Sequence, residues 1–344
     1  MACESRPPKI PVAIQVCAGV LLWIGSTGSG VTLAVPAADG DQTTQPAATV
    51  PVPPADIKVH QPQIHTWPIR VDVEMVIIGV TVTDPHGRVA PGLSKSNFKV
   101  YDENVLQQVT SFSTDDAPAS VGIIFDSSGS MWNKLEKSRV AALQFFKTSN
   151  PDDEFMLIEF NERPNLLSKF TSKLEALQDR LLLMECTGRT ALLDAIYLGL
   201  HEMKEAHLKR KALLVISDGG DNHSRYTEKD IRRAVKESDV QIFGIGILGP
   251  RFRWLPGESS GPALLSRLAK ISGGRMFPAE HARDLPDIAQ KISVDLRNEY
   301  VIGYKPSNLV RDGRWRHISV RLSPPGDVAR LQVYNRSGYY APTQ

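Results

Sequence analysis

The sequence has few cysteines and no large excess of charge of either sign. Its 344 residues include three cysteines, Cys3, Cys17 and Cys186, and the first two lie in a segment that resembles a targeting signal. Removal of that segment would leave one thiol, which cannot form an internal disulfide, and no CxxC pair is present to bind zinc. Lys and Arg number 40 against 38 Asp and Glu, a formal net charge of +2. Because nucleic-acid binding needs a strong basic field, we expect no nucleic-acid partner.

Aromatic residues make up only 7% of the chain, and the composition as a whole is ordinary for a folded protein. Hydrophobic residues make up 42% and charged residues 23%. Such a chain is too apolar to be disordered throughout. Its length suggests about two domains, or one domain with additional segments.

The N-terminal residues have the pattern of a secretory signal peptide. Arg6 and Lys9 precede an uncharged stretch, residues 12–35, whose most apolar part reads VAIQVCAGVLLWIG, and small residues follow at 35–37. We predict a signal peptide over residues 1–37, cleaved after Ala37, and export to the periplasm, the cell surface or the medium. The uncharged stretch is also long enough to span a bilayer, so an uncleaved membrane anchor is the alternative.

The same region contains a Gly-rich segment that we do not interpret as a nucleotide site. Residues 25–32 read GSTGSGVT, and Val31 stands where a phosphate-binding loop has its lysine. We therefore expect no nucleotide ligand. Residues 38–68 are rich in Pro, Thr, Gln and Ala, a composition that favours extended backbone, and we predict a linker there.

The middle of the chain alternates apolar runs with amphipathic segments. Predicted strands cover residues 120–125, 154–160, 212–217, 240–248 and 275–278, and predicted helices cover residues 134–147, 173–184, 190–206, 228–237, 262–272 and 284–298. Near-continuous apolar strands separated by amphipathic helices predict an α/β fold with a doubly wound, mostly parallel sheet covered on both faces. Ligands of such sheets bind at the carboxyl ends of the strands.

The two flanks, residues 69–116 and 299–344, show the alternating pattern of half-buried strands. Predicted strands cover residues 71–83, 98–101 and 107–112 in the first flank, and 300–304, 315–322 and 329–334 in the second. Neither flank alone has enough strands to close a core. We expect the flanks to pair into one small β-sandwich-like module, into which the central domain, residues 117–298, is inserted.

Oxygen-bearing side chains gather where predicted strands end. Residues 126–130 read DSSGS, with Asp126, Ser128 and Ser130 at alternate positions, and Thr190 and Asp218 follow on two further loops. Because these loops lie at one edge of the predicted sheet, the five oxygens suit a hard cation, Mg²⁺ or else Mn²⁺ or Ca²⁺. Ser and Asp are also common helix N-caps, so for the isolated motif a cap without metal is the alternative.

These segments carry a family resemblance. DSSGS, Thr190 and the segment ISDGGD, residues 216–221, together resemble the metal-ion-dependent adhesion site (MIDAS) of von Willebrand factor type A (VWFA) domains, which have a doubly wound, Rossmann-like fold. The resemblance implies that Ser128, Ser130 and Thr190 contact the metal directly, and that Asp126 and Asp218 hold it largely through water. Residues 71–112 and 299–340 of the flanks, the second ending in SGYY at 337–340, resemble VWFA-related proteins of Acidobacteria. We expect a turn or capping role for Asp221.

A metal with an open coordination position would bind an acidic side chain of another protein. We therefore expect a cation-dependent adhesion or scaffold module whose partner presents an acidic residue, with no enzymatic activity and with membrane contact only if the N-terminal segment stays uncleaved. The alternatives are a structural envelope protein whose metal only stabilises the fold, and a hydrolase that uses Asp126 or Ser128 as nucleophile. The hydrolase is disfavoured because a second Asp two residues after Asp126 is missing and because Ser128 does not stand in a Gly-x-Ser-x-Gly motif.

Overall fold

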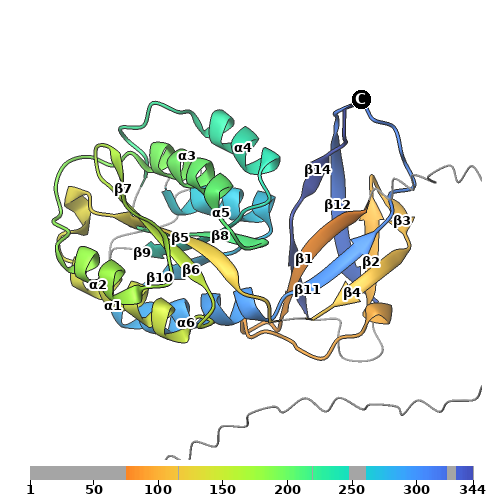
Figure 1. The fold of residues 1–344 in the computed structure, drawn as a ribbon, viewed down its shortest axis with the longest axis horizontal. Coiled ribbons are helices and arrows are strands. Elements are labelled where there is room, and N and C mark those ends of the chain that lie inside the picture. The colour runs from red at the N-terminus through yellow and green to blue at the C-terminus, as the bar shows by residue number, and fades with distance from the viewer. Residues whose placement is uncertain (1–74, 115, 219, 248–260, 324–330, 344) are drawn as a thin grey trace, which may run out of the picture. The chain divides into compact units, whose positions relative to one another are not determined.

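A six-stranded sheet forms the centre of the inserted domain in this computed structural model (Figure 1). Its strands lie in the order β10-β9-β8-β5-β6-β7, and all neighbours are parallel except β6 and β7. Their bounds are β5 (Ala119–Asp126), β6 (Glu154–Phe160), β7 (Pro164–Thr171), β8 (Arg210–Ser217), β9 (Gln241–Ile247) and β10 (Met276–Ala279). Every residue of β5 is buried, as expected of a central parallel strand.

Helices cover both faces of this sheet (Figure 1). One face packs against α1 (Leu135–Thr148), α2 (Leu174–Leu182) and α6 (Leu285–Arg297), and the other against α3 (Leu192–Glu202), α4 (Glu228–Glu237) and α5 (Gly261–Ser272). Short 3-10 turns are η1 (Lys95–Asn97), η2 (Gly129–Met131), η3 (Met203–Glu205) and η4 (Ala282–Asp284). The predicted doubly wound, mostly parallel α/β fold is confirmed.

The flanking segments form two four-stranded antiparallel sheets, in the orders β13-β1-β11-β4 and β14-β12-β2-β3. The strands before the central domain are β1 (Val76–Thr83), β2 (Phe98–Asp102), β3 (Val105–Gln107) and β4 (Val109–Ser113); those after it are β11 (Tyr300–Tyr304), β12 (Trp315–Leu322), β13 (Gln332–Asn335) and β14 (Gly338–Tyr340). Both sheets mix strands of both flanks around one core. The expected shared module is therefore confirmed.

The largest differences from the sequence prediction concern β3, β4, β7 and β14. The predicted strand over residues 107–112 is wrong in detail, because Gln107 ends β3 in one sheet and Val109 begins β4 in the other. The edge strand β7 and the short β14 were not predicted. β7 is half-exposed along most of its length, so it lacks the apolar run of a buried strand.

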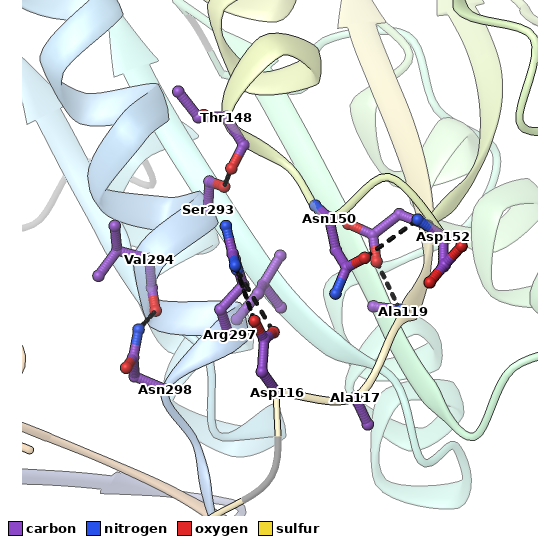
Figure 2. Close-up of polar contacts among 12 residues, drawn as sticks. Asp116, Ala117, Ala119, Thr148, Asn150, Asp152, Ser293, Val294, Arg297 and Asn298 are labelled. Carbon is purple, nitrogen blue, oxygen red and sulfur yellow. Dashed lines mark hydrogen bonds and ion pairs between the residues drawn. The ribbon is translucent and has the colours of Figure 1, made fainter.

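The connections into and out of the central domain meet at one point, shown in Figure 2. Arg297 at the end of α6 donates to the carboxylate of Asp116, just before β5, with a closest distance of 2.7 Å between Nη2 and Oδ2. This bond lowers the pKa of Asp116. Nearby, the Ser293 hydroxyl donates to the carbonyl oxygen of Thr148 at 2.6 Å, which ties α6 to α1. The two connections between the central domain and the flanks are thus held beside each other.

The structure describes residues 75–114, 116–218, 220–247, 261–323 and 331–343. The predicted signal peptide with its cleavage site, the Gly-rich segment at 25–32 and the linker at 38–68 lie outside these residues and stay predictions. Within the described ranges, no helix is long and apolar enough to cross a bilayer.

Candidate metal site

Asp126 ends β5 and forms the buried base of the candidate site. Its side chain is 0% exposed. The Ser128 backbone N–H donates to Oδ1 at 2.9 Å, and the Ser217 hydroxyl donates to Oδ2 at 2.5 Å. Burial raises the pKa of Asp126 to about 6, although these hydrogen bonds act against the rise. The carboxylate is therefore held in place by neutral donors.

Ser128 and Ser130 of the DSSGS segment extend this arrangement to the next strand. Ser128 Oγ lies 3.2 Å from Ser130 Oγ, and the Ser130 hydroxyl donates to Asp218 Oδ1 at 2.8 Å. Strands β5 and β8 are parallel neighbours, with Phe125 opposite Ile216, so their carboxyl ends meet at the same edge. Hydrogen bonds thus connect Asp126, Ser128, Ser130 and Asp218.

The loop before α3 is bound to the DSSGS segment through backbone atoms. The Gly129 N–H donates to the Gly188 carbonyl at 3.1 Å, and the Thr187 N–H donates to the Ser127 carbonyl at 2.9 Å. Gly188 has φ +73°, a left-handed conformation that favours glycine. This tether places the loop that carries Thr190 next to the other candidates.

Thr190 itself is less closely joined to the set. It is 5% exposed, and its backbone N–H donates to Asn222 Oδ1 at 2.9 Å. Among the described residues, its hydroxyl makes no hydrogen bond with the other four candidates. The structure thus joins four of the five predicted residues directly and holds the fifth on a neighbouring loop.

Sequence reasoning missed two residues at the site, Ser217 and Lys134. Ser217 directly precedes Asp218, so the segment ISDGGD contained a signal for it. The Lys134 Nζ lies 2.5 Å from Asp218 Oδ2, a contact across 84 positions that no local pattern indicates. The capping role of Asp221 is confirmed, because its Oδ1 accepts from the Leu193 N–H in the first turn of α3 at 3.3 Å.

The donor set fits a hard cation. It offers two carboxylates and three hydroxyls, all oxygen, and Mg²⁺ accepts such ligands and keeps several waters. No group of three or more His, Cys, Asp or Glu residues suited to a metal occurs in the described part of the chain. Any cation at this edge would therefore depend on hydroxyl and water ligands, in contrast to zinc.

Comparison with known proteins identifies the central domain. Residues 121–220 match the family model of the von Willebrand factor type A domain, and they contain all five candidate residues. With the sheet topology described above, this match defines a VWFA domain. A comparison with curated proteins found no match.

Several solved structures are similar to the chain. A von Willebrand factor type A protein from Catenulispora acidiphila is 12% identical over 73% of this chain and 75% of that chain, with a TM-score of 0.46. An aerotolerance-related membrane protein from Bacteroides fragilis is 17% identical over 51% of this chain and 98% of that chain, with a TM-score of 0.43. The PilB minor pilin from Streptococcus sanguinis is 13% identical over 53% of this chain and 62% of that chain, with a TM-score of 0.42.

Proposed function

We propose that this protein is an exported, divalent-cation-dependent protein-binding module, used for adhesion or as a scaffold. Its VWFA domain would hold Mg²⁺, or Mn²⁺ or Ca²⁺, at a MIDAS formed by Asp126, Ser128, Ser130, Thr190 and Asp218. The metal would accept an acidic side chain of the partner as a further ligand. The observation that carries this proposal is the hydrogen-bonded chain from Asp126 to Asp218, which places two carboxylates and two hydroxyls at one edge of the sheet.

Binding without a chemical step agrees with the surroundings of Asp126. Both of its carboxylate oxygens accept hydrogen bonds and the side chain is buried, so it is poorly placed to attack a substrate. Cys186 is half-buried beside the core, and burial raises the pKa of its thiol, which disfavours the reactive thiolate.

Export is supported by the sequence alone. Arg6, Lys9 and the apolar stretch behind them have the order of a signal peptide, and the resemblance of the flanks to VWFA-related proteins of Acidobacteria agrees with a bacterial envelope or secreted protein. Sequencing the mature N-terminus from a fractionated host tests this part. A terminus near Ala38 is expected, and full-length protein in the cytoplasm would contradict it.

Metal binding is tested by melting curves over a Mg²⁺ titration, with Mn²⁺ and Ca²⁺ in parallel. A cation that binds only the folded protein stabilises it by about 1.4 kcal/mol at ten times its Kd, or about 3–6 °C in Tm. We expect this increment in the wild type and its loss in Asp126→Asn. The matched control is Asp152→Asn, an exposed residue before β6 at the opposite end of the sheet, which should behave as wild type. Equal shifts in wild type and Asp126→Asn would place the cation elsewhere.

The partner is tested separately by capture from envelope extract in Mg²⁺ or in chelator. Capture that disappears both with chelator and in Asp126→Asn supports cation-bridged binding. A protein that gains stability from Mg²⁺ but captures partners equally well in chelator would have a purely stabilising metal. Metal-dependent turnover of generic phosphate or ester substrates would favour the hydrolase.

A further inference from the structure

Lys134 holds the second carboxylate of the candidate site with an ammonium group. Its Nζ lies 2.5 Å from Asp218 Oδ2, while the Ser130 hydroxyl donates to Oδ1 of the same carboxylate. The Asp218 side chain is 4% exposed and that of Lys134 is 20% exposed. Both oxygens of Asp218 therefore have donors within the protein, and one of these donors carries a positive charge.

The position of Lys134 is unfavourable for the helix that follows it. Lys134 is the N-cap of α1, where Ser, Thr, Asp or Asn is usual, and its side chain makes no capping hydrogen bond. The N-terminus of a helix carries a partial positive charge that repels an ammonium group. A residue type that disfavours the helix it begins is expected where that residue has another role. The ion pair with Asp218 is the contact that offsets this cost.

The ammonium also changes the charge that a cation would meet. Asp126 and Asp218 together carry two negative charges when ionised, and Lys134 leaves one uncompensated. A divalent cation beside Ser130 would be repelled by the ammonium and would share Asp218 with it. A water molecule bound to the metal and a lysine ammonium both donate hydrogen bonds to a carboxylate, so the two would compete for the same oxygen of Asp218.

We propose that Lys134 is an internal competitor of the metal: its ammonium holds Asp218 in the metal-free protein and lowers the affinity of the site for divalent cations. This inference rests on the proposed metal site. Metal occupancy would then depend strongly on a further negative ligand, such as the acidic side chain of a partner. Lys134 is thus a residue that tunes cation affinity, distinct from the five proposed ligands.

The test measures Mg²⁺ affinity by calorimetry in wild type, Lys134→Met and Lys134→Gln, each with the full chain. Removal of a positive charge a few ångströms from a dication should tighten Mg²⁺ binding roughly tenfold. Lys134→Arg, which keeps the charge, should stay near the wild-type value. The matched control is Lys137→Met, an exposed lysine on the same helix, which should also bind as wild type.

Melting curves give a second readout that a purely structural lysine would not produce. Without metal, Lys134→Met should melt below the wild type, because the buried carboxylate of Asp218 loses its cation. Subsaturating Mg²⁺ should then raise the Tm of Lys134→Met more than that of the wild type, so that the gap between them narrows. Lys134→Gln serves the same comparison if the methionine variant does not fold.

The outcomes separate this inference from the metal proposal. If wild type binds Mg²⁺ and both uncharged variants bind it within twofold of wild type, or more weakly, Lys134 is not a competitor and the metal site stands. If neither wild type nor any variant binds Mg²⁺ or Mn²⁺, the metal site itself is wrong, and the competition between cation and lysine is excluded with it.

Discussion

At the scale of single residues, the protein satisfies the two carboxylates of the candidate site in different ways. Asp126 is buried and accepts from a backbone N–H and a serine hydroxyl, which are neutral. Asp218 accepts from a serine hydroxyl and from the ammonium of Lys134. The first arrangement keeps an acceptor in place without cancelling its charge, whereas the second cancels it. Each carboxylate should therefore respond differently to substitution.

Gly188 should matter to metal affinity although it offers no side chain. A Cβ at this residue would lie 2.7 Å from Cγ of Glu162, and φ of +73° disfavours any other residue. Gly188→Ala should cost about 1–2 kcal/mol in stability because of its backbone conformation. It should also weaken Mg²⁺ binding at the proposed site, because the Gly188 carbonyl accepts from the Gly129 N–H of the DSSGS segment. Chemical denaturation and calorimetry would measure both effects.

Gly92 provides the matched control for this prediction. It also has a positive φ, +82°, but a Cβ there meets nothing within 4 Å, and it lies in the first flank. Gly92→Ala should cost a similar free energy of backbone strain and leave Mg²⁺ affinity unchanged. If both variants bound Mg²⁺ as tightly as wild type, the hydrogen bond between Gly188 and Gly129 would not be needed for metal binding.

At the scale of elements, a buried ion pair joins α6 to the segment that leads into β10. Arg275 Nη1 lies 2.6 Å from Asp295 Oδ2, and the Asp295 side chain is 1% exposed. The guanidinium of Arg275 also stacks on Tyr334 of β13, at 4.6 Å from the ring centroid. Burial raises the pKa of Asp295 to about 6, and the charges of Arg275 and Lys291 act against the rise.

This raised pKa predicts a pH dependence of stability. Because the pKa of Asp295 is higher in the folded chain than its usual value of 3.8, the folded protein binds an extra proton between those two values. The contribution of Asp295 to stability is therefore largest at low pH and is lost as pH rises through about 6. Between pH 7 and pH 5 it amounts to about 1 kcal/mol, or about 2–4 °C in Tm.

Melting curves of Asp295→Asn and wild type at pH 5 and pH 7 test this expectation. The variant should gain about 2–4 °C less than wild type when the pH is lowered. Asp287→Asn, an exposed substitution on the same helix, should retain the wild-type pH dependence. A variant with the full wild-type dependence would show that Asp295 titrates near its usual pKa.

The elements that could be predicted from sequence are those whose burial is visible in the local pattern. The bounds of β6, α4, β11 and β12 match the prediction, and β5 and β8 were recognised as continuous apolar runs. The break between β3 and β4 was missed because the chain changes sheets there without a turn signal such as Gly or Pro. Long-range contacts, such as that between Lys134 and Asp218, cannot be predicted from the local sequence pattern.

The loops of the site were predictable because the ends of parallel strands meet at one edge.

At the scale of the whole molecule, the module built from both flanks depends on strands far apart in sequence. β1 lies between β11 and β13, and β2 pairs with β12 on one side. Removing residues 300–344 would take away both neighbours of β1 and expose Ile78, Val80 and Val82, all 0% exposed in the full chain. The first flank would then have no closed core.

Limited proteolysis of the truncated protein should therefore cut within residues 76–113 much faster than in the full chain. Lys95 and Lys99 are suitable trypsin sites, since they lie at η1 and in β2. Cleavage within the central domain should change far less, because its sheet is covered by its own helices. Equal resistance of residues 76–113 in both proteins would show that the first flank folds without the second.

The two connections between the central domain and the flanks, joined by Asp116 and Arg297, have a mechanical consequence. They lie before β5 and after α6, whereas Asp126 lies at the other end of β5, about 26 Å away along a strand of eight residues. A partner bound at the edge that carries Asp126 would pull along the parallel strands, and the tension would leave the domain through the two adjacent connections to the flanks. Strands loaded along their length must shear many hydrogen bonds at once before they separate. A pull applied at that edge would therefore be resisted by the hydrogen bonds between β5 and its neighbours β6 and β8 before it reached the β-sandwich-like module.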